Sequence, residues 1–82
     1  MQKVIVTATK VDSYELVFIV GNKVIAYIMK SQQFTGKYKG FVYGFSDSRQ
    51  TFINLDYPDT LKFVSDCIER GFNRLGLNVE FK

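Results

Sequence analysis

Histidine and tryptophan are absent from the 82 residues of this chain, and cysteine and proline occur only once each. The absence of histidine removes the side chain that most often acts as a base near neutral pH and that most often binds metals. The single cysteine, Cys67, excludes an intramolecular disulfide and any metal site built on several thiolates. These absences argue against an enzyme, and we expect no catalytic residue, no cofactor and no metal.

Long apolar segments are also missing. No run approaches the ~18 consecutive apolar residues that a membrane span requires. The first eleven residues alternate β-branched and polar side chains, without the apolar core and cleavage site of a signal peptide. With one cysteine, a reducing compartment is the simpler interpretation, so we expect a cytoplasmic protein that does not contact membranes. No motif indicates a small-molecule substrate, and the length fits a single domain, residues 1–82.

The first two thirds of the chain have the alternation and turn residues of β-strands. Gly21-Asn22 separates two apolar runs and predicts a type II′ hairpin. Every link is too short for the crossover that parallel strands need, so the strands are expected to form an antiparallel meander. The predicted strands are residues 2–10, 14–20, 23–30, 37–45 and 50–55, with a turn at 46–48.

At Asp56 the apolar period changes from two to 3.6 residues. The stripe formed by Leu61, Val64, Ile68, Phe72 and Leu75 predicts a helix over Pro58–Leu75 that covers one sheet face. Residues 77–81 alternate again and predict a last strand or an extended tail on a sheet edge. The predicted fold class is α+β: an antiparallel five-stranded β-meander, one α-helix packed on one sheet face and a short C-terminal strand, in the order βββββαβ.

The second and third predicted strands are apolar on both faces. Residues 16–20 and 24–29 are unbroken apolar runs, which is typical of strands buried on both sides. One helix can cover only one face. The other face therefore requires a second copy of the chain, curling of the sheet onto itself, or another protein, and we favour the first two over the third.

The most basic segment, residues 30–45, has three lysines, no acid and five interleaved aromatic residues. On a strand, Lys39, Phe41, Tyr43 and Phe45 share one face, while Gly40 and its alternate neighbours share the other. Rings beside lysines suit single-stranded nucleic acid, because bases stack on the rings and phosphates meet the ammonium groups. The more ordinary expectation, which we favour, is that the ring stripe packs beneath the helix.

Residues Lys39-Gly40-Phe41-Val42-Tyr43 are similar in part to the basic-Gly-aromatic-x-aromatic core of the RNA-recognition motif. The similarity stops at Gly44 and Ser46, where that motif has an aliphatic and an aromatic residue. That fold also needs a helix after its first strand, whereas a tight turn follows here. We therefore do not assign the chain to this family.

The outer face of the predicted helix carries mixed charge. Arg70 and Arg74 lie one turn apart and could hold an acidic partner, although a solvated face is the default interpretation. Phe63 widens the apolar stripe and is either core or contact, and Cys67 is expected in the core.

Two functional hypotheses follow. The first in order of preference is a small non-enzymatic module that binds a protein, through self-association as a homodimer or as a regulatory or inhibitory protein of the kind that viruses and mobile elements encode. The alternative is a single-stranded nucleic-acid-binding protein, although a net charge of +3 is modest for that role. The candidate binding residues for protein or nucleic acid are Lys37, Lys39, Phe41, Tyr43, Phe45, Arg49, Arg70 and Arg74.

Overall fold

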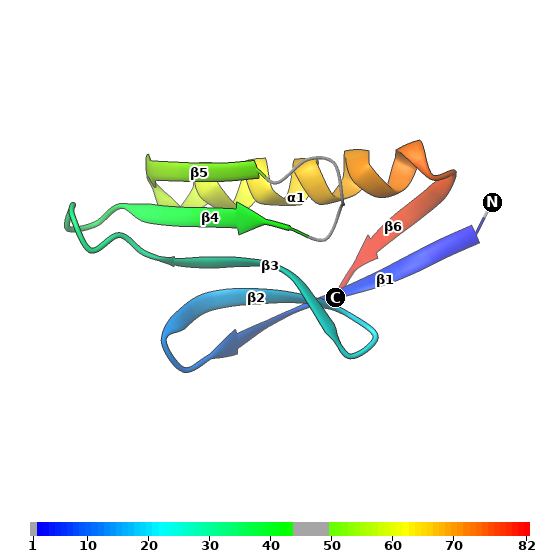
Figure 1. Cartoon of the computed structure of the whole chain (residues 1–82), viewed down its shortest axis with the longest axis horizontal. Coiled ribbons are helices and arrows are strands. Elements are labelled where there is room, and N and C mark those ends of the chain that lie inside the picture. The colour runs from blue at the N-terminus through cyan, green and yellow to red at the C-terminus, as the bar shows by residue number, and fades with distance from the viewer. Residues whose placement is uncertain (1, 44–49) are drawn as a thin grey trace.

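A computed structural model describes residues 2–43 and 50–82 (Figure 1). The predicted α+β class and the predicted order of strands, helix and last strand are confirmed, and the turn predicted at 46–48 lies outside the described residues. The fourth strand is shorter than predicted. The elements are β1 (Gln2–Val11), β2 (Tyr14–Val20), β3 (Lys23–Lys30), β4 (Tyr38–Val42), β5 (Gln50–Leu55), α1 (Tyr57–Arg74) and β6 (Leu77–Phe81).

The six strands form one mixed sheet in the order β5-β4-β3-β2-β1-β6. Neighbours from β5 to β1 are antiparallel, as the short links predict, and β6 adds parallel to β1. The ten-residue β1 serves two partners, because its first half pairs with β6 and its second half pairs with β2. The sheet thus curls along β1, as Figure 1 shows.

Irregular pairing sharpens this curl. Opposite Lys10 of β1, the register of β2 shifts by one residue at Glu15 and Leu16. In β3, the register shifts at Ile25, so that Ile25 and Ala26 are both buried although they are consecutive. Such bulges increase the local twist of a strand. They also resolve part of the apolar run in β3, because two adjacent residues enter the same core.

The β2–β3 hairpin has the predicted turn. Val20 pairs with Lys23 across two residues, and Gly21 has φ +63° whereas Asn22 has no positive φ. A positive φ at the first central position alone is the type II′ pattern, which glycine adopts without steric cost.

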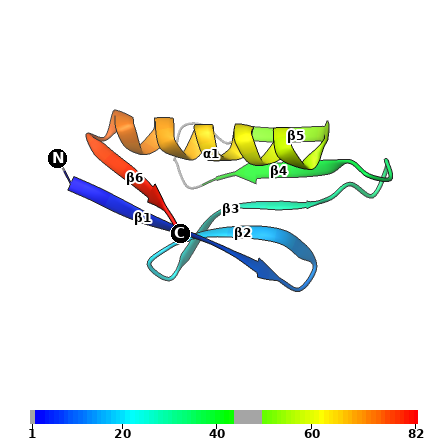
Figure 2. The same cartoon turned by 180° about the vertical axis from the view of Figure 1, so that it is seen from behind.

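Helix α1 packs on one face of β4 and β5 and reaches β6 (Figures 1 and 2). Val64 and Ile68 of the predicted stripe are fully buried, and Leu61 and Phe72 pack against the core. Leu75 is a correction to the prediction, because the helix ends at Arg74 and Leu75 is 67% exposed. Gly76, with φ +79°, follows as the helix C-terminal glycine.

Glycine at position 40 determines how closely α1 approaches the sheet. A Cβ atom placed on Gly40 would lie 2.5 Å from Cγ2 of Val64 and 3.0 Å from Cγ2 of Thr60. Thr60 is itself fully buried, and its hydroxyl donates to the backbone carbonyl of Asp56 at 2.9 Å. Gly40 thus allows side chains of α1 to pack directly against β4; Gly44 lies outside the described residues.

The core lies between α1 and one face of the curled sheet. It contains alternate residues of the inner strands, among them Val6, Phe18, Ile28 and Val42. Cys67 belongs to this core, as predicted. The opposite face, which we call the helix-free face, receives the remaining residues of the apolar runs.

Candidate interaction face

Four aromatic rings from three consecutive strands and the adjoining residue meet on the helix-free face. Tyr27 is central, because its ring centroid lies 5.1 Å from that of Tyr14, 5.6 Å from that of Phe41 and 6.1 Å from that of Tyr43. Tyr27 and Phe41 stack at 17°, because they are paired across β3 and β4. We call these four side chains the ring cluster.

The ring cluster does not lie beneath the helix. Gly40 and Val42 face α1, so alternation turns Phe41, which lies between them, to the other side of β4. The favoured expectation that the ring stripe packs under α1 is therefore wrong for Phe41 and Tyr43. Tyr38 is the ring of this strand that does reach the helix, where it meets Tyr57 at 5.1 Å.

An apolar hollow of about 270 Å³ adjoins the rings. Val17, one of its lining residues, is only 6% exposed although it lies outside the core beneath α1, so other side chains already cover part of this face. The sheet is curled, which is one of the three predicted means of covering the second face, but the ring cluster stays half-exposed. The hollow is lined by Val11, Tyr14, Val17, Ile19, Val24, Tyr27 and Tyr43.

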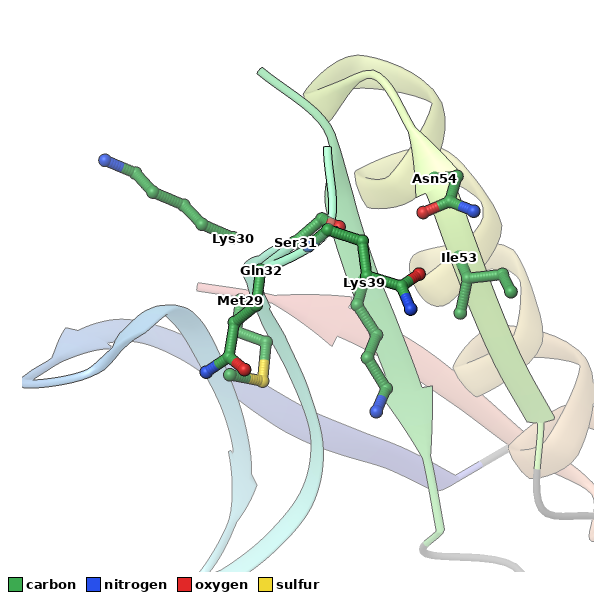
Figure 3. A pocket seen from close by; sticks show the side chains of 8 residues that line it. Met29, Lys30, Ser31, Gln32, Lys39, Ile53 and Asn54 are labelled. Atoms are coloured by element: carbon green, nitrogen blue, oxygen red, sulfur yellow. The ribbon is translucent and has the colours of Figure 1, made fainter. Parts of the chain in front are cut away.

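Lys39 is the charged side chain of this face. It stands two residues before Phe41 on β4 and is paired with Met29 of β3. Figure 3 shows the Lys39 side chain extended across β4 beside Met29 and Ile53, in an open pocket of about 360 Å³. No ion pair holds its ammonium group among the described residues. A cation beside uncovered rings can therefore meet an anionic group of a partner.

The phenol of Tyr43 is kept neutral by its surroundings. Burial against the neighbouring rings raises the pKa of Tyr43 above its usual value of 10.0, and the nearby phenols of Tyr27 and Tyr14 raise it further. The group therefore stays a hydrogen-bond donor throughout the physiological range.

Lys37 is not placed with Lys39. Its ammonium group lies 2.8 Å from Oδ1 of Asp56, the residue that precedes α1. This ion pair ties the start of β4 to the start of the helix. Lys37 is thus ion-paired, whereas Lys39 has no ion pair among the described residues. That the two lysines act on one surface stays a prediction, and the remaining predicted residues of this segment, Phe45 and Arg49, lie outside the described residues.

Arg70 and Arg74 are exposed on α1, which covers the opposite side of the sheet. They are one turn apart, as predicted, but they do not join Lys39 and the rings. Arg70 instead lies beside the buried thiol of Cys67. Burial raises the pKa of that thiol, and the positive charges of Arg70 and Arg74 oppose the rise only in part.

Sequence reasoning missed half of the face. Tyr14, Tyr27 and the valine and isoleucine side chains of the hollow were predicted only as members of apolar strands. For Val17, Ile19, Val24 and Tyr27, the signal was the excess of apolar residues in residues 16–20 and 24–29; Val11 and Tyr14 lie outside both runs. The register of β3 against β4, which brings Tyr27 beside Phe41, follows from no turn motif in residues 31–37.

In residues 2–43 and 50–82, no group of three acidic or cysteine side chains gathers closely enough to hold a metal ion. The one helix of these ranges is not long and apolar enough to cross a bilayer.

No protein-family model has a significant match to the chain, and no curated protein and no solved structure has one either.

Proposed function

We propose that this protein is a small non-enzymatic module that binds a protein partner through the helix-free face. The observation that carries the proposal is the ring cluster around Tyr27, which no described segment covers. Aromatic side chains are enriched among the residues that dominate protein interfaces, especially beside apolar hollows that a partner side chain fills. A regulatory or inhibitory role agrees with a small domain whose described residues hold an aromatic cluster on an open sheet face.

The apolar character of the hollow favours protein over nucleic acid. Its lining has seven residues, none of them charged. A partner that fills it gains from apolar burial, at about 25 cal/mol per Å² of surface removed from water. Phosphates and riboses are polar and would not remove that apolar surface from water.

Affinity capture with paired baits tests the proposal. The wild-type chain should retain a partner that the double substitution Phe41→Ser and Tyr43→Ser loses, since truncating an interface anchor typically costs about 2 kcal/mol or more, or about 30-fold in affinity. Leu75→Ser is the matched control, because Leu75 is exposed at the end of α1 and far from the rings. With the purified partner added, the aromatic NMR signals of Tyr27 and Tyr43 should shift.

Two results would overturn the proposal. One is a partner retained equally by the wild type and by a folded double variant. The other is a complex in which the signals of α1 shift and those of the ring cluster do not. Circular dichroism of both variants shows whether the fold is intact.

Single-stranded nucleic acid is the second candidate, because Lys39, which has no ion pair among the described residues, lies on the same face as Phe41 and Tyr43. Binding of this kind weakens steeply with salt, as counterions are released from the phosphates. Fluorescence anisotropy of a labelled thymidine oligonucleotide should then show a salt dependence whose logarithmic slope falls by about 1 in Lys39→Ala. An absence of binding at low salt removes this candidate.

A further inference from the structure

The sheet ends in an open edge at β5. This strand pairs with β4 on one side, and no described strand pairs with its other side. Figures 1 and 2 show β4 and α1 along it and no described element beyond it. Among the described residues, no strand therefore takes up its outward backbone N–H and C=O groups.

The β5 edge lacks the usual protection. Natural sheets guard their edges with charged side chains or proline, yet β5 reads Gln-Thr-Phe-Ile-Asn-Leu and has neither. The other edge, β6, carries Glu80, which is ion-paired to Lys3 at 3.0 Å and to Lys82 at 3.3 Å. In β5, a bulge formed by Ile53 and Asn54, which together stand opposite Lys39, interrupts the strand, and Asn54 has φ +59°. Residues 50–52 pair regularly with β4.

Large apolar side chains flank this edge on both sheet faces. Ile53 is 58% exposed and lies on the helix-free face beside Lys39. On the other face, Phe52 stacks on Phe63 of α1 at 5.6 Å, and Phe63 is 42% exposed. A strand added to β5 would cover both groups at once.

We propose that β5 pairs antiparallel with β5 of a second copy of the chain, so that two sheets join into one. A second copy suits this edge because an uncharged strand that pairs with itself about a two-fold axis opposes no like charges. The same axis places the two α1 helices on one face of the joined sheet, where Phe63 of each copy meets the other. This interface is separate from the ring cluster and does not depend on the function proposed above.

The solution mass of the full chain tests this pairing. Light scattering during size-exclusion chromatography should give twice the 9.5 kDa of the chain at high concentration. Ile53→Lys places a charge on the edge and should return the mass to that of the monomer. The matched control, Leu75→Lys, alters a more exposed residue away from the edge and should remain dimeric.

Three outcomes would overturn the proposal: a wild-type chain that is monomeric at every concentration, a folded Ile53→Lys variant that keeps the dimer mass, or a dimer that only ring-cluster variants disrupt. Where Ile53→Lys does not fold, Phe63→Glu provides the second variant. Hydrogen exchange gives an independent reading, because the outward amides of residues 50–52 should become protected as the concentration of the wild type rises. A failure here leaves the ring-cluster proposal untouched, since that proposal is tested with substitutions at Phe41 and Tyr43 and not at the β5 edge.

Discussion

Gly40 shows how a single missing side chain sets the distance between two elements. Because no Cβ stands between β4 and α1, Val64 and Thr60 pack directly on the strand. Both are fully buried. Any side chain at this position must displace the helix or distort the strand.

Gly40→Ala should therefore lower the free energy of unfolding by about 1–3 kcal/mol, the usual cost of overpacking a core. Urea denaturation followed by circular dichroism measures the change. Val64→Ala removes the atom that the new methyl group meets at 2.5 Å. The double variant should then lose less stability than the two single variants together, and simple additivity would contradict the contact.

The buried thiol of Cys67 should make the free energy of unfolding depend on pH. Burial raises the pKa of its thiol in the folded state. Below the unfolded thiol pKa of about 8.5, both states are protonated and the contribution to stability is complete. Above that pH the unfolded chain releases the proton first, so the free energy of unfolding should fall as pH rises.

Urea denaturation between pH 7 and pH 9.5 tests this prediction, and Cys67→Ala should flatten the decline. The window stops at 9.5 because the pKa values of Tyr43 and Tyr57 are also raised, from 10.0, and these groups add a similar decline at higher pH. An equal slope in the wild type and in Cys67→Ala would refute the role of the thiol.

At the scale of elements, the junction of β5 and α1 depends on Asp56, which its position before the helix would assign to capping. Asp56 precedes the helix at the N-cap position, yet its carboxylate makes no capping hydrogen bond and instead accepts from Lys37. The ion pair therefore joins β4 to the helix start. Both groups are partly exposed, so salt screens their attraction.

Asp56→Ala should cost at most about 1 kcal/mol of unfolding free energy, as is typical of a surface ion pair. Lys37→Ala should cost about the same, and the double variant no more than either alone, because both changes break one interaction. Thermal melts at low salt and at 1 M salt measure this. A cost that persists unchanged at high salt would indicate that Asp56 stabilises α1 as a cap.

At the scale of the whole molecule, the fold closes where the last strand pairs with the first. β6 pairs with the first half of β1, and the backbone N–H of Ala8 donates to the carbonyl of Lys82 at 2.8 Å. The ring of Phe81 packs edge to face on the buried ring of Phe18, with 6.4 Å between the ring centroids, and Val79 packs against the core. The last strand thus covers core that the meander and helix alone leave open.

Deleting residues 77–82 should therefore unfold the chain or reduce it to a loosely packed state, since a domain of this size has a small margin of stability. Near-ultraviolet circular dichroism and the dispersion of NMR signals measure this. Phe81→Ala is the milder companion and should lower stability without abolishing the fold. A deletion variant with native NMR dispersion would show that β6 is dispensable.

The strand and helix patterns were sufficient to predict the fold class, the Gly21-Asn22 hairpin and most of the helix. These features depend on local periodicity and on backbone preferences, which neighbouring residues carry by themselves. The prediction that Leu75 belongs to the helix stripe was wrong because the helix ends one residue before it. At a helix end, a difference of one residue decides whether a side chain is buried or exposed.

The sequence by itself determined that alternate strand residues point to opposite faces, and hence that Phe41 shares a face with Lys39 and not with Gly40. Only the tertiary structure decided which of those faces the helix covers. Alternation alone allows the helix to cover either the face with the rings or the face with the glycine. Close packing decides between the two faces, since Val64 and Thr60 fit against Gly40 and not against Phe41. Registers and bulges that no local pattern encodes then bring Tyr14 and Tyr27 to the same rings.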